Sequence, residues 1–140
     1  LIINEMKLKI GDSQTEEFII SQTQVNQFAE LTGDKNPLHT NKNYALKTRF
    51  KKPIVHGLFS VTSMAKIMGT KFPGEGTIHI SQNYNFKKPV FPDTKYIVYI
   101  ELTRILKKKH IGIFKTQVID KETKEVVIDG TGAALHYEKL

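Results

Sequence analysis

The sequence predicts an α+β fold in which an antiparallel sheet curves around one long central helix. Residues 57–72 have helical periodicity, and Lys66 and Lys71 are their sole charged side chains, which is typical of a buried helix. Apolar and polar residues alternate over much of residues 76–137, which indicates strands. The last three apolar runs follow one another without room for crossover helices, so their strands must be antiparallel.

The composition is that of a folded protein with a single domain, residues 1–140. The chain is 39% hydrophobic and 25% charged, and its length is sufficient for a continuous core. It has no Cys, which excludes disulfides, a thiolate nucleophile and Cys-based metal sites. No apolar run reaches the roughly 18–20 residues that span a bilayer, and charge interrupts Leu1–Glu5 too soon for a signal peptide. We therefore expect a cytoplasmic location.

Basic residues exceed acidic ones, 21 against 14, which gives a formal charge of +7 and suggests an anionic partner. Apart from two arginines the basic residues are lysines, whereas proteins that read nucleic-acid grooves favour the bidentate arginine fork. The lysine groups fall between apolar segments and not along one helix face, so neither nucleic acid nor a membrane is the expected partner. The lysine groups are Lys51-Lys52, Lys87-Lys88 and Lys107-Lys108-Lys109.

The elements before the central helix are short. We expect two strands and two helices, at residues 6–10, 17–20, 21–33 and 40–46. Gly11-Asp12 forms the turn between the strands. Ser21 or Thr23 caps the first helix, and Gly33 suits its C-terminal end.

The remaining strands follow the central helix. They are expected at residues 76–86, 96–102, 111–119 and 126–137, with residues 120–124 as a hairpin loop. Ile97 and Tyr99 make the second face of residues 96–102 apolar as well, which suggests that a second subunit covers it. This layout of a curved antiparallel sheet around one helix is usually called a hot dog.

Residues 31–39 carry the most specific chemical pattern of the chain. They place an acid, an amide and an imidazole together as Asp34, Asn36 and His39. Pro37 disfavours the helical region at Asn36, so we expect an ordered loop and not a helix. A carboxylate and an imidazole on such a loop can both point at one water molecule. The alternative is a capping loop in which Asp34 or Asn36 binds local amides and His39 lies on the surface.

The start of the central helix is the second candidate feature. Gly57 opens the helix after residues 53–56, and a helix N-terminus presents unpaired N–H groups. Without a Cβ at Gly57, a ligand can approach this backbone closely, and a polarised carbonyl oxygen can be held there. Alternatively, Gly57 permits a tight turn, with His56 in a structural role. The histidines have no zinc-helix spacing, and no complete dinucleotide, Walker or nucleophile-elbow motif is present.

The segments 28–39, FAELTGDKNPLH, and 53–57, PIVHG, resemble the hydratase-2 motif and the start of the central helix of MaoC-like dehydratases. The resemblance extends over essentially the whole chain. It implies a hot-dog fold, a homodimer or a higher homo-oligomer of dimers, and (R)-specific enoyl-CoA hydratase activity. It implies no metal and no cofactor other than the coenzyme A of the substrate.

The resemblance also implies roles for single residues. Asp34 and His39 would activate the water that adds to the enoyl thioester, with Asn36 supporting their loop. The Gly57 N–H would bind the thioester oxygen. Ala65 departs from the family pattern, since some relatives carry a serine at this position facing the site.

Two further groups of residues complete the expected site. The candidate acyl-pocket residues are Phe28, Leu31, Tyr44, Phe50 and Val55. The candidate phosphate-steering residues are Lys51, Lys52, Lys87 and Lys88. The alternatives are a 3-hydroxyacyl-acyl-carrier-protein dehydratase, a thioesterase and a non-catalytic acyl-thioester-binding subunit. A hot-dog thioesterase would need a carboxylate on the central helix, and residues 57–72 contain none.

Overall fold

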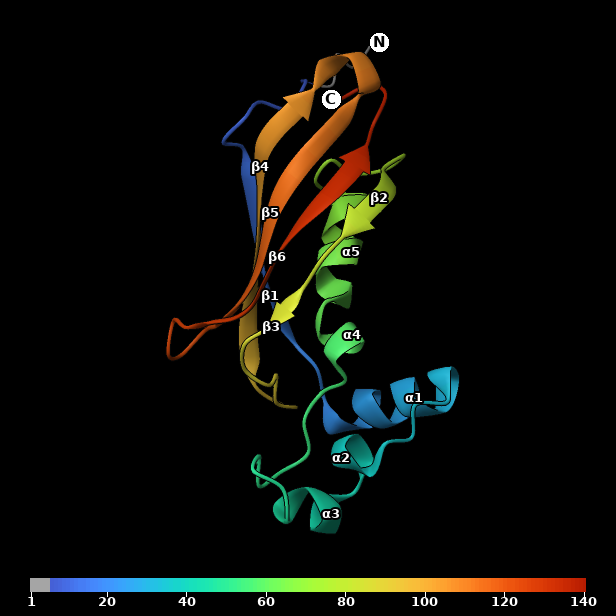
Figure 1. Ribbon diagram of the computed structural model, residues 1–140, viewed down its shortest axis with the longest axis vertical. Helices are drawn as coiled ribbons and strands as arrows, with labels where there is room; N and C mark the ends of the chain where they lie inside the picture. The colour runs from blue at the N-terminus through green and yellow to red at the C-terminus, as the bar shows by residue number, and fades with distance from the viewer. Residues whose placement is uncertain (1–5) are drawn as a thin grey trace.

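The computed structural model describes residues 6–140, and an antiparallel sheet dominates it (Figure 1). The strand order is β1-β4-β5-β6-β2, and β3 pairs with a further part of β6. The strands are β1 (Ser13–Ile19), β2 (Ile78–Gln82), β3 (Asn85–Phe86), β4 (Lys95–Leu106), β5 (Ile111–Asp120) and β6 (Val126–Leu135). From the sequence we expect that residues 1–5 do not begin a signal peptide; these residues lie outside the part of the chain that the structure describes.

The central strands β4, β5 and β6 confirm the alternation seen in the sequence. Along β4 every second side chain is buried, from Tyr96 to Leu102, because strand side chains point to opposite faces in turn. The Tyr96 hydroxyl accepts a hydrogen bond from the Phe91 N–H at 2.9 Å, so the buried ring keeps its polar end satisfied. On the other face, Ile97 and Tyr99 are half-buried within the single chain.

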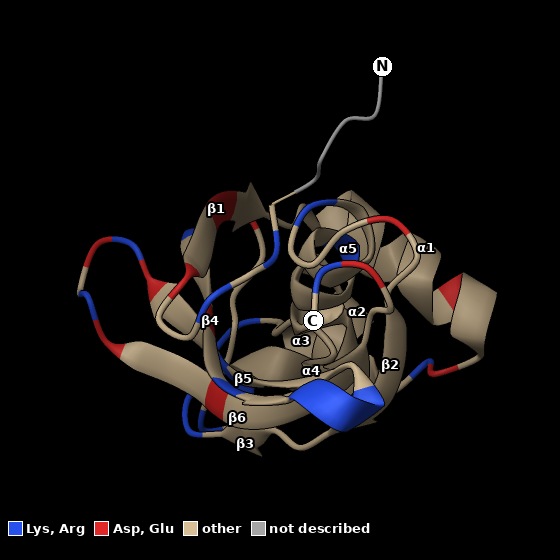
Figure 2. Ribbon diagram, turned by 90° about the horizontal axis from the view of Figure 1, so that it is seen from above, with Lys and Arg blue, Asp and Glu red and all other residues tan. Residues whose placement is uncertain are grey.

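The sheet curves around a central helical segment (Figure 2). The helices are α1 (Gln22–Thr32), α2 (Pro37–Thr40), α3 (Lys42–Leu46), α4 (Gly57–Ser60) and α5 (Thr62–Thr70), with a 3₁₀ turn, η1 (Lys107–Lys109). Met64, Ile67 and Met68 of α5 are fully buried in the core formed with the sheet. This confirms the hot-dog arrangement. No helix within residues 6–140 is long and apolar enough to cross a membrane.

The central helix differs from the single buried helix expected over residues 57–72. It is broken at Val61 and ends at Thr70. At the break, the Ser60 hydroxyl donates to the Gly57 carbonyl and the Thr62 hydroxyl to the Phe59 carbonyl, and such bonds compete with the helical ladder. The helix is also not buried all round, since Leu58 is 70% exposed.

The edge strands differ from the expectation, although the expected strand at residues 17–20 overlaps the end of β1. Residues 6–10 form no strand; β1 begins at Ser13, where polar side chains hide the strand pattern. The expected strand 76–86 is divided into β2 and β3, and the pairing of β2 with β6 shifts between His79 and Ser81. Ile78 of β2 is 56% exposed, because an edge strand has a neighbour on one side only.

The N-terminal helices begin and end as their capping residues predict. Ser21 and Gln24 form a reciprocal capping box at the start of α1, and Gly33 ends that helix with a φ of 79°, which favours glycine. Asn41 caps α3 by accepting a hydrogen bond from the Tyr44 N–H at 2.9 Å. In Figure 1, α1, α2 and α3 lie together at one end of the central helix.

Candidate active site

The sequence from Asn36 to Thr40 forms a single helical turn, α2, and not the loop expected from Pro37. The expectation was wrong because proline is tolerated at the first position of a helix, where its missing N–H is not needed. Asn36 caps this turn by accepting a hydrogen bond from the Leu38 N–H at 3.1 Å, so its side chain serves the backbone. The turn holds His39 in a fixed position.

His39 is buried, and its protonation pattern follows from its contacts. The Nδ1 atom lies 2.8 Å from the carbonyl oxygen of Ile54. A carbonyl can only accept, so Nδ1 carries the hydrogen of the neutral ring and Nε2 keeps a free lone pair. Burial lowers the pKa of His39, and the neighbouring His56 lowers it further; the Ile54 carbonyl and the Asp34 carboxylate act in the opposite direction. His39 therefore presents Nε2 as a base at neutral pH.

Asp34 is exposed, but its backbone is held from two sides. Its N–H approaches the Thr32 hydroxyl at 3.3 Å, and its carbonyl accepts a hydrogen bond from His56 Nε2 at 2.9 Å. Its carboxylate accepts a hydrogen bond from the Asn36 N–H at 3.3 Å. This leaves carboxylate lone pairs available for a water molecule or substrate.

His56 lies beneath both candidate catalytic residues. Its ring stacks on His39 with 3.9 Å between centroids, and the tilted Phe28 ring lies 4.8 Å from it, centroid to centroid. Because Nε2 donates to the Asp34 carbonyl, Nδ1 is an acceptor, and it has no hydrogen-bond partner among residues 6–140. His56 is 2% exposed. The sequence placed it at the start of the central helix but gave no sign that it contacts both candidate catalytic residues.

Asp34, His39 and His56 bring a carboxylate oxygen and two ring nitrogens within 4.8 Å of one another. Donors of this kind can bind a transition metal. However, the two rings are stacked with 28° between their planes, so their in-plane lone pairs do not converge well on a single ion. A ring nitrogen of His39 and a carboxylate oxygen of Asp34 lie within 4.8 Å of one another, close enough for one water molecule to hydrogen-bond to both.

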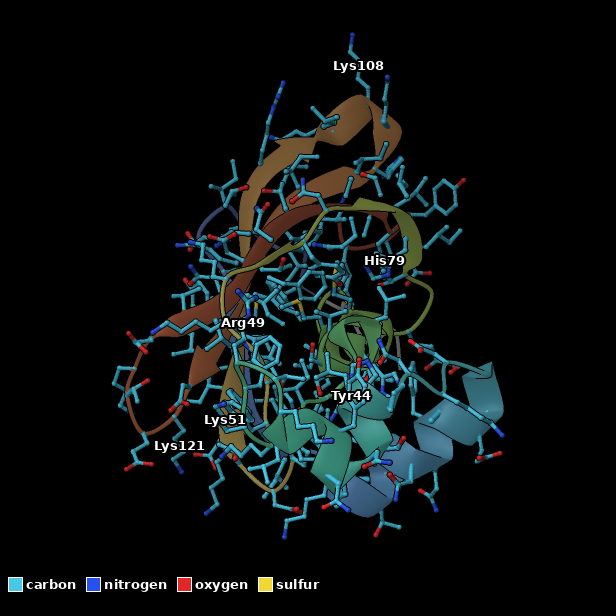
Figure 3. All side chains as sticks on the ribbon, turned by 60° about the horizontal axis from the view of Figure 1, so that its bottom comes forward. Tyr44, Arg49, Lys51, His79, Lys108 and Lys121 are labelled. Atoms are coloured by element: carbon cyan, nitrogen blue, oxygen red, sulfur yellow. The ribbon has the colours of Figure 1, made fainter. Side chains whose placement is uncertain are left out.

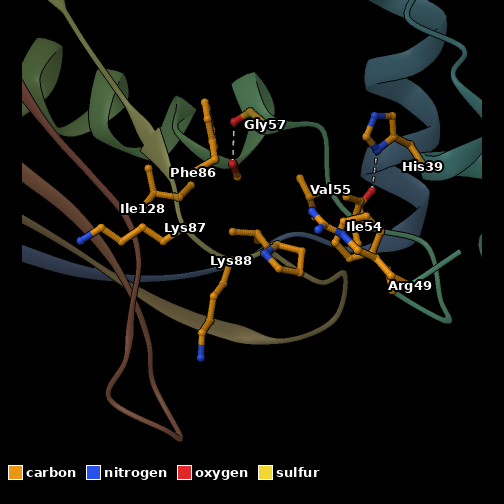
Figure 4. Close-up of a pocket in the computed structure, with 13 residues that line it drawn as sticks. His39, Arg49, Ile54, Val55, Gly57, Phe86, Lys87, Lys88 and Ile128 are labelled. Carbon is orange, nitrogen blue, oxygen red and sulfur yellow. Dashed lines mark hydrogen bonds between the residues drawn. The ribbon is translucent and has the colours of Figure 1, made fainter.

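A cavity of about 200 Å³ adjoins His39 (Figure 4). Its lining is mostly apolar, with Phe50, Val55 and Ile128 among the contributing side chains. Three basic residues, Arg49, Lys87 and Lys88, also line it. We call this the first cavity.

A second cavity of about 310 Å³ contains Asp34 and His56. It is completed by Phe28, Thr32, Gly57, Leu58 and Phe86. Gly57 and Phe86 line both cavities.

The remaining expected acyl-pocket residues are not all brought together. Phe50 and Val55 line the first cavity, and Phe28 lines the second. Leu31 is 85% exposed and Tyr44 49% exposed, and neither lines a cavity beside Asp34 or His39.

The expected steering lysines differ in their surroundings. Lys87 is paired with Asp129 at 2.5 Å and Lys88 with Glu125 at 2.6 Å. Lys51 is exposed and lies outside the first cavity, on the same side of the molecule as Arg49 (Figure 3). The Lys52 ammonium lies 4.1 Å from the centroid of the Phe91 ring.

The lining residues that were missed from the sequence include Arg49, Ser60 and Phe86. Arg49 forms no ion pair with any residue of the described range 6–140, and its guanidinium lies 4.8 Å from the Phe50 centroid. Ser60 is a buried hydroxyl whose Oγ donates to the Gly57 carbonyl at 2.6 Å. Ala65 is exposed on α5 and lines neither cavity.

Gly57 is exposed at the first position of α4. Its N–H has no acceptor among residues 6–140. A Cβ at this position would lie 3.2 Å from Cε1 of Phe86, so the glycine makes room for that ring.

Comparisons with known proteins place this geometry in context. A family model described as "MaoC like domain" matches residues 6–127. The "(R)-specific enoyl-CoA hydratase" of Rhodospirillum rubrum is 32% identical over 128 residues, which are 91% of this chain and 88% of that protein. The mitochondrial "3-hydroxyacyl-[acyl-carrier-protein] dehydratase" of Arabidopsis thaliana is 29% identical over 96% of this chain and 81% of that protein. The solved structure of an (R)-hydratase from A. caviae, involved in PHA biosynthesis, has a TM-score of 0.87 at 28% identity, and the match covers 91% of this chain and 96% of that one.

Proposed function

Because the chain belongs to the MaoC-like domain family, we propose that it is an (R)-specific enoyl-CoA hydratase. Such an enzyme adds water reversibly to a trans-2-enoyl-CoA and yields the (3R)-3-hydroxyacyl-CoA. One observation carries the proposal: a neutral, buried His39 lies beside the exposed Asp34, within 4.8 Å of its carboxylate. This is a site for a single activated water molecule.

Water activation is assigned to His39 and Asp34 together. Water donates one hydrogen bond to the Asp34 carboxylate, which orients it. His39 Nε2 removes the other proton as the water oxygen bonds to C3 of the substrate. The electron pair of the C2–C3 double bond moves towards the thioester, which becomes an enolate. The protonated His39 then returns its proton to C2, so that the net change is the addition of water. General bases of this kind contribute about 10²–10⁴-fold to the rate.

The enolate oxygen requires a hydrogen-bond donor, and we assign this role to the Gly57 N–H. This N–H has no acceptor among the described residues 6–140, and Gly57 lines both the cavity of His39 and that of Asp34. A donor fixed before the reaction stabilises the developing negative charge without reorganisation. The chemistry needs no cofactor apart from the coenzyme A of the substrate.

Binding of the coenzyme A phosphates is assigned to the basic side of the first cavity. Arg49 is the strongest candidate, since it has no ion-pair partner among the described residues. Lys87 and Lys88 line the same cavity but are engaged with carboxylates. Lys51 and Lys52 would act at longer range, through the electrostatic field that attracts a phosphorylated ligand.

A dehydratase acting on acyl-carrier-protein thioesters is the alternative with a specific observation behind it, the similarity to the Arabidopsis thaliana enzyme. Both activities use the same water chemistry and differ in the carrier. A thioesterase is disfavoured because α4 and α5 contain no carboxylate. A non-catalytic binding subunit would not need both Asp34 and His39.

We also propose that the protein is a homodimer, or a higher homo-oligomer of dimers, in the cytoplasm. Within residues 6–140, β2 lies at one edge of the sheet and has no strand paired on its outer side. Ile78 and Ile80 on this strand are 56% and 51% exposed, and exposed apolar edge strands promote pairing with another chain. Light scattering coupled to size-exclusion chromatography tests the oligomer, and fractionation of the source cells tests the location.

The activity is tested by following the enoyl-thioester absorbance of crotonyl-CoA. We expect hydration by the wild-type protein and a rate lower by about 10²–10⁴-fold for Asp34→Asn, since the amide cannot replace the carboxylate. Because Asp34 is exposed, the variant should melt as the wild type does. An equal rate in the variant would refute the assignment. The same assay with crotonyl thioesters of coenzyme A and of acyl carrier protein distinguishes the enoyl-CoA hydratase from the acyl-carrier-protein dehydratase.

A further inference from the structure

Phe86 lies beside Gly57 (Figure 4) and lines both the first and the second cavity. Three ring carbons, Cε1, Cζ and Cδ1, lie 3.2, 3.3 and 3.6 Å from the position that a Cβ of Gly57 would occupy. They are the nearest heavy atoms to that position apart from Gly57, its chain neighbours and the nearby backbone of α4. The Phe86 ring therefore packs against Gly57, the residue whose N–H we propose as the donor to the thioester oxygen.

Both cavities include this ring in their walls. His39 opens onto the first cavity and Asp34 onto the second. Because His39 and Asp34 hold the same water in the proposed mechanism, C2 and C3 of the substrate must lie beside both residues, near the Gly57 and Phe86 that the two cavities share. The substrate chain beyond C3 then passes the edge of the Phe86 ring.

The volumes of the two cavities indicate that the Phe86 ring limits the space open to a substrate. The first cavity holds about 200 Å³, which is below the roughly 300 Å³ at which ligand pockets usually begin. Joined to the second cavity of about 310 Å³, it would fall within the usual range. Gly57 and Phe86 line both cavities, so we expect removal of the Phe86 ring to join them.

The backbone that carries the ring is fixed, whereas the ring itself is not packed into the core. Phe86 pairs with Ile128 in the sheet, and Asn85 donates from Nδ2 to the Asp129 carboxylate at 3.1 Å. The ring is 51% exposed. Truncation should therefore change the shape of the site without leaving a void in the core.

We propose that Phe86 is the specificity-determining residue for acyl chain length. Its ring limits the space beyond C3, so the wild-type enzyme favours short enoyl chains. This inference rests on the proposed hydratase function and adds to it a residue outside the family motif segments identified in the sequence.

The test compares kcat/KM for crotonyl-CoA and trans-2-decenoyl-CoA. We expect Phe86→Ala to raise the decenoyl-to-crotonyl ratio by about tenfold or more, which is the usual effect of methylene-sized changes in an apolar pocket. Phe86→Leu should shift the ratio in the same direction by less, and Phe86→Trp in the opposite direction. Tyr137→Ala is the control, because Tyr137 is an aromatic residue, 67% exposed, that lines neither cavity.

A measurement without turnover separates this inference from the hydratase proposal. Isothermal titration with butyryl-CoA and decanoyl-CoA gives the same chain-length comparison for saturated ligands. A wild-type protein that hydrates neither enoyl-CoA would refute the hydratase function, whatever the binding data. The role of Phe86 would be refuted if all three Phe86 variants melt as the wild type does and keep its chain-length ratios within twofold, both for binding of the saturated ligands and for kcat/KM of the enoyl substrates.

Discussion

The replacement His39→Asn separates the chemical role of His39 from its structural role. In the wild type, Nδ1–H donates to the Ile54 carbonyl at 2.8 Å, and Nε2 has the free lone pair. The amide nitrogen of asparagine is attached to Cγ, as Nδ1 is, so it can make the same hydrogen bond. The variant therefore keeps the link to Ile54 and loses the base.

The expected effects on rate and stability differ in size. Loss of a general base should lower kcat for crotonyl-CoA by about 10²–10⁴-fold. The free energy of unfolding should fall by less than about 1.5 kcal/mol, the value of an aromatic stacking contact such as that with His56. His39→Ala removes the base and also leaves the Ile54 carbonyl without a donor, which adds about 1–3 kcal/mol of destabilisation.

Two assays measure these quantities on the same samples. The rate comes from the loss of enoyl-thioester absorbance, and the free energy of unfolding from urea denaturation. The assignment of His39 as the general base would be wrong if His39→Asn retained more than about a tenth of the wild-type rate, because the expected loss begins at about 10²-fold. The structural role of His39 would be wrong if His39→Asn were as unstable as His39→Ala, since the hydrogen bond to Ile54 would then have no measurable value.

Four further outcomes are expected from the same structure. Since the pKa of His39 lies below its ordinary value of 6.5, the acid limb of kcat/KM should lie below pH 6.5, and a limb above that pH would contradict the burial argument. The unfolded chain binds a proton at His39 more readily than the folded chain does. The contribution of His39 to the free energy of unfolding is therefore full above pH 6.5, and it falls as the pH drops from there towards the pKa of the folded state. Urea denaturation at several pH values measures this contribution. Dialysis against EDTA should leave the hydration rate unchanged, and a loss that zinc restores would show that Asp34, His39 and His56 hold a metal. Ile67→Ala should lower the free energy of unfolding by about 2–5 kcal/mol, because Ile67 is fully buried in the core, and urea denaturation would contradict this with a change below about 1 kcal/mol.

The central strands could be predicted from the sequence because pattern and burial coincide there. Along β4 the alternating residues that suggest a strand are the ones that the core buries. The edge strands lack this agreement. β1 starts with five polar residues, Ser13 to Glu17, and β2 exposes its isoleucines, so hydrophobic alternation located them poorly.

The central helix shows a second limit of periodicity. Ser60 and Thr62 fit a helical pattern as well as other residues do, but their hydroxyl groups compete for backbone carbonyls at the break. Whether the apolar Leu58 lies inside the chain or on its surface depends on what surrounds the helix. Its hydrophobicity alone does not answer that.

The candidate site was predictable where it lies on one short segment. Asp34, Asn36 and His39 are close in sequence, and the structure brings the acid and the imidazole together. Arg49 and Phe86 come from separate segments, and neither belongs to a local pattern. Their place at the site follows from the pairing of β3 with β6 and from the course of the chain after α3.

The attachment of Asp34 to the protein has a consequence for how this site can change. His56 holds residue 34 by its backbone carbonyl, a group that every amino acid possesses. The shape of the loop is therefore largely independent of the side chain that it displays. Evolution or design can exchange the acid at position 34 for another functional group on the same scaffold, with His39 still fixed by Ile54. In this architecture the side chain at position 34 can change the chemistry of the site with little effect on the stability of the fold.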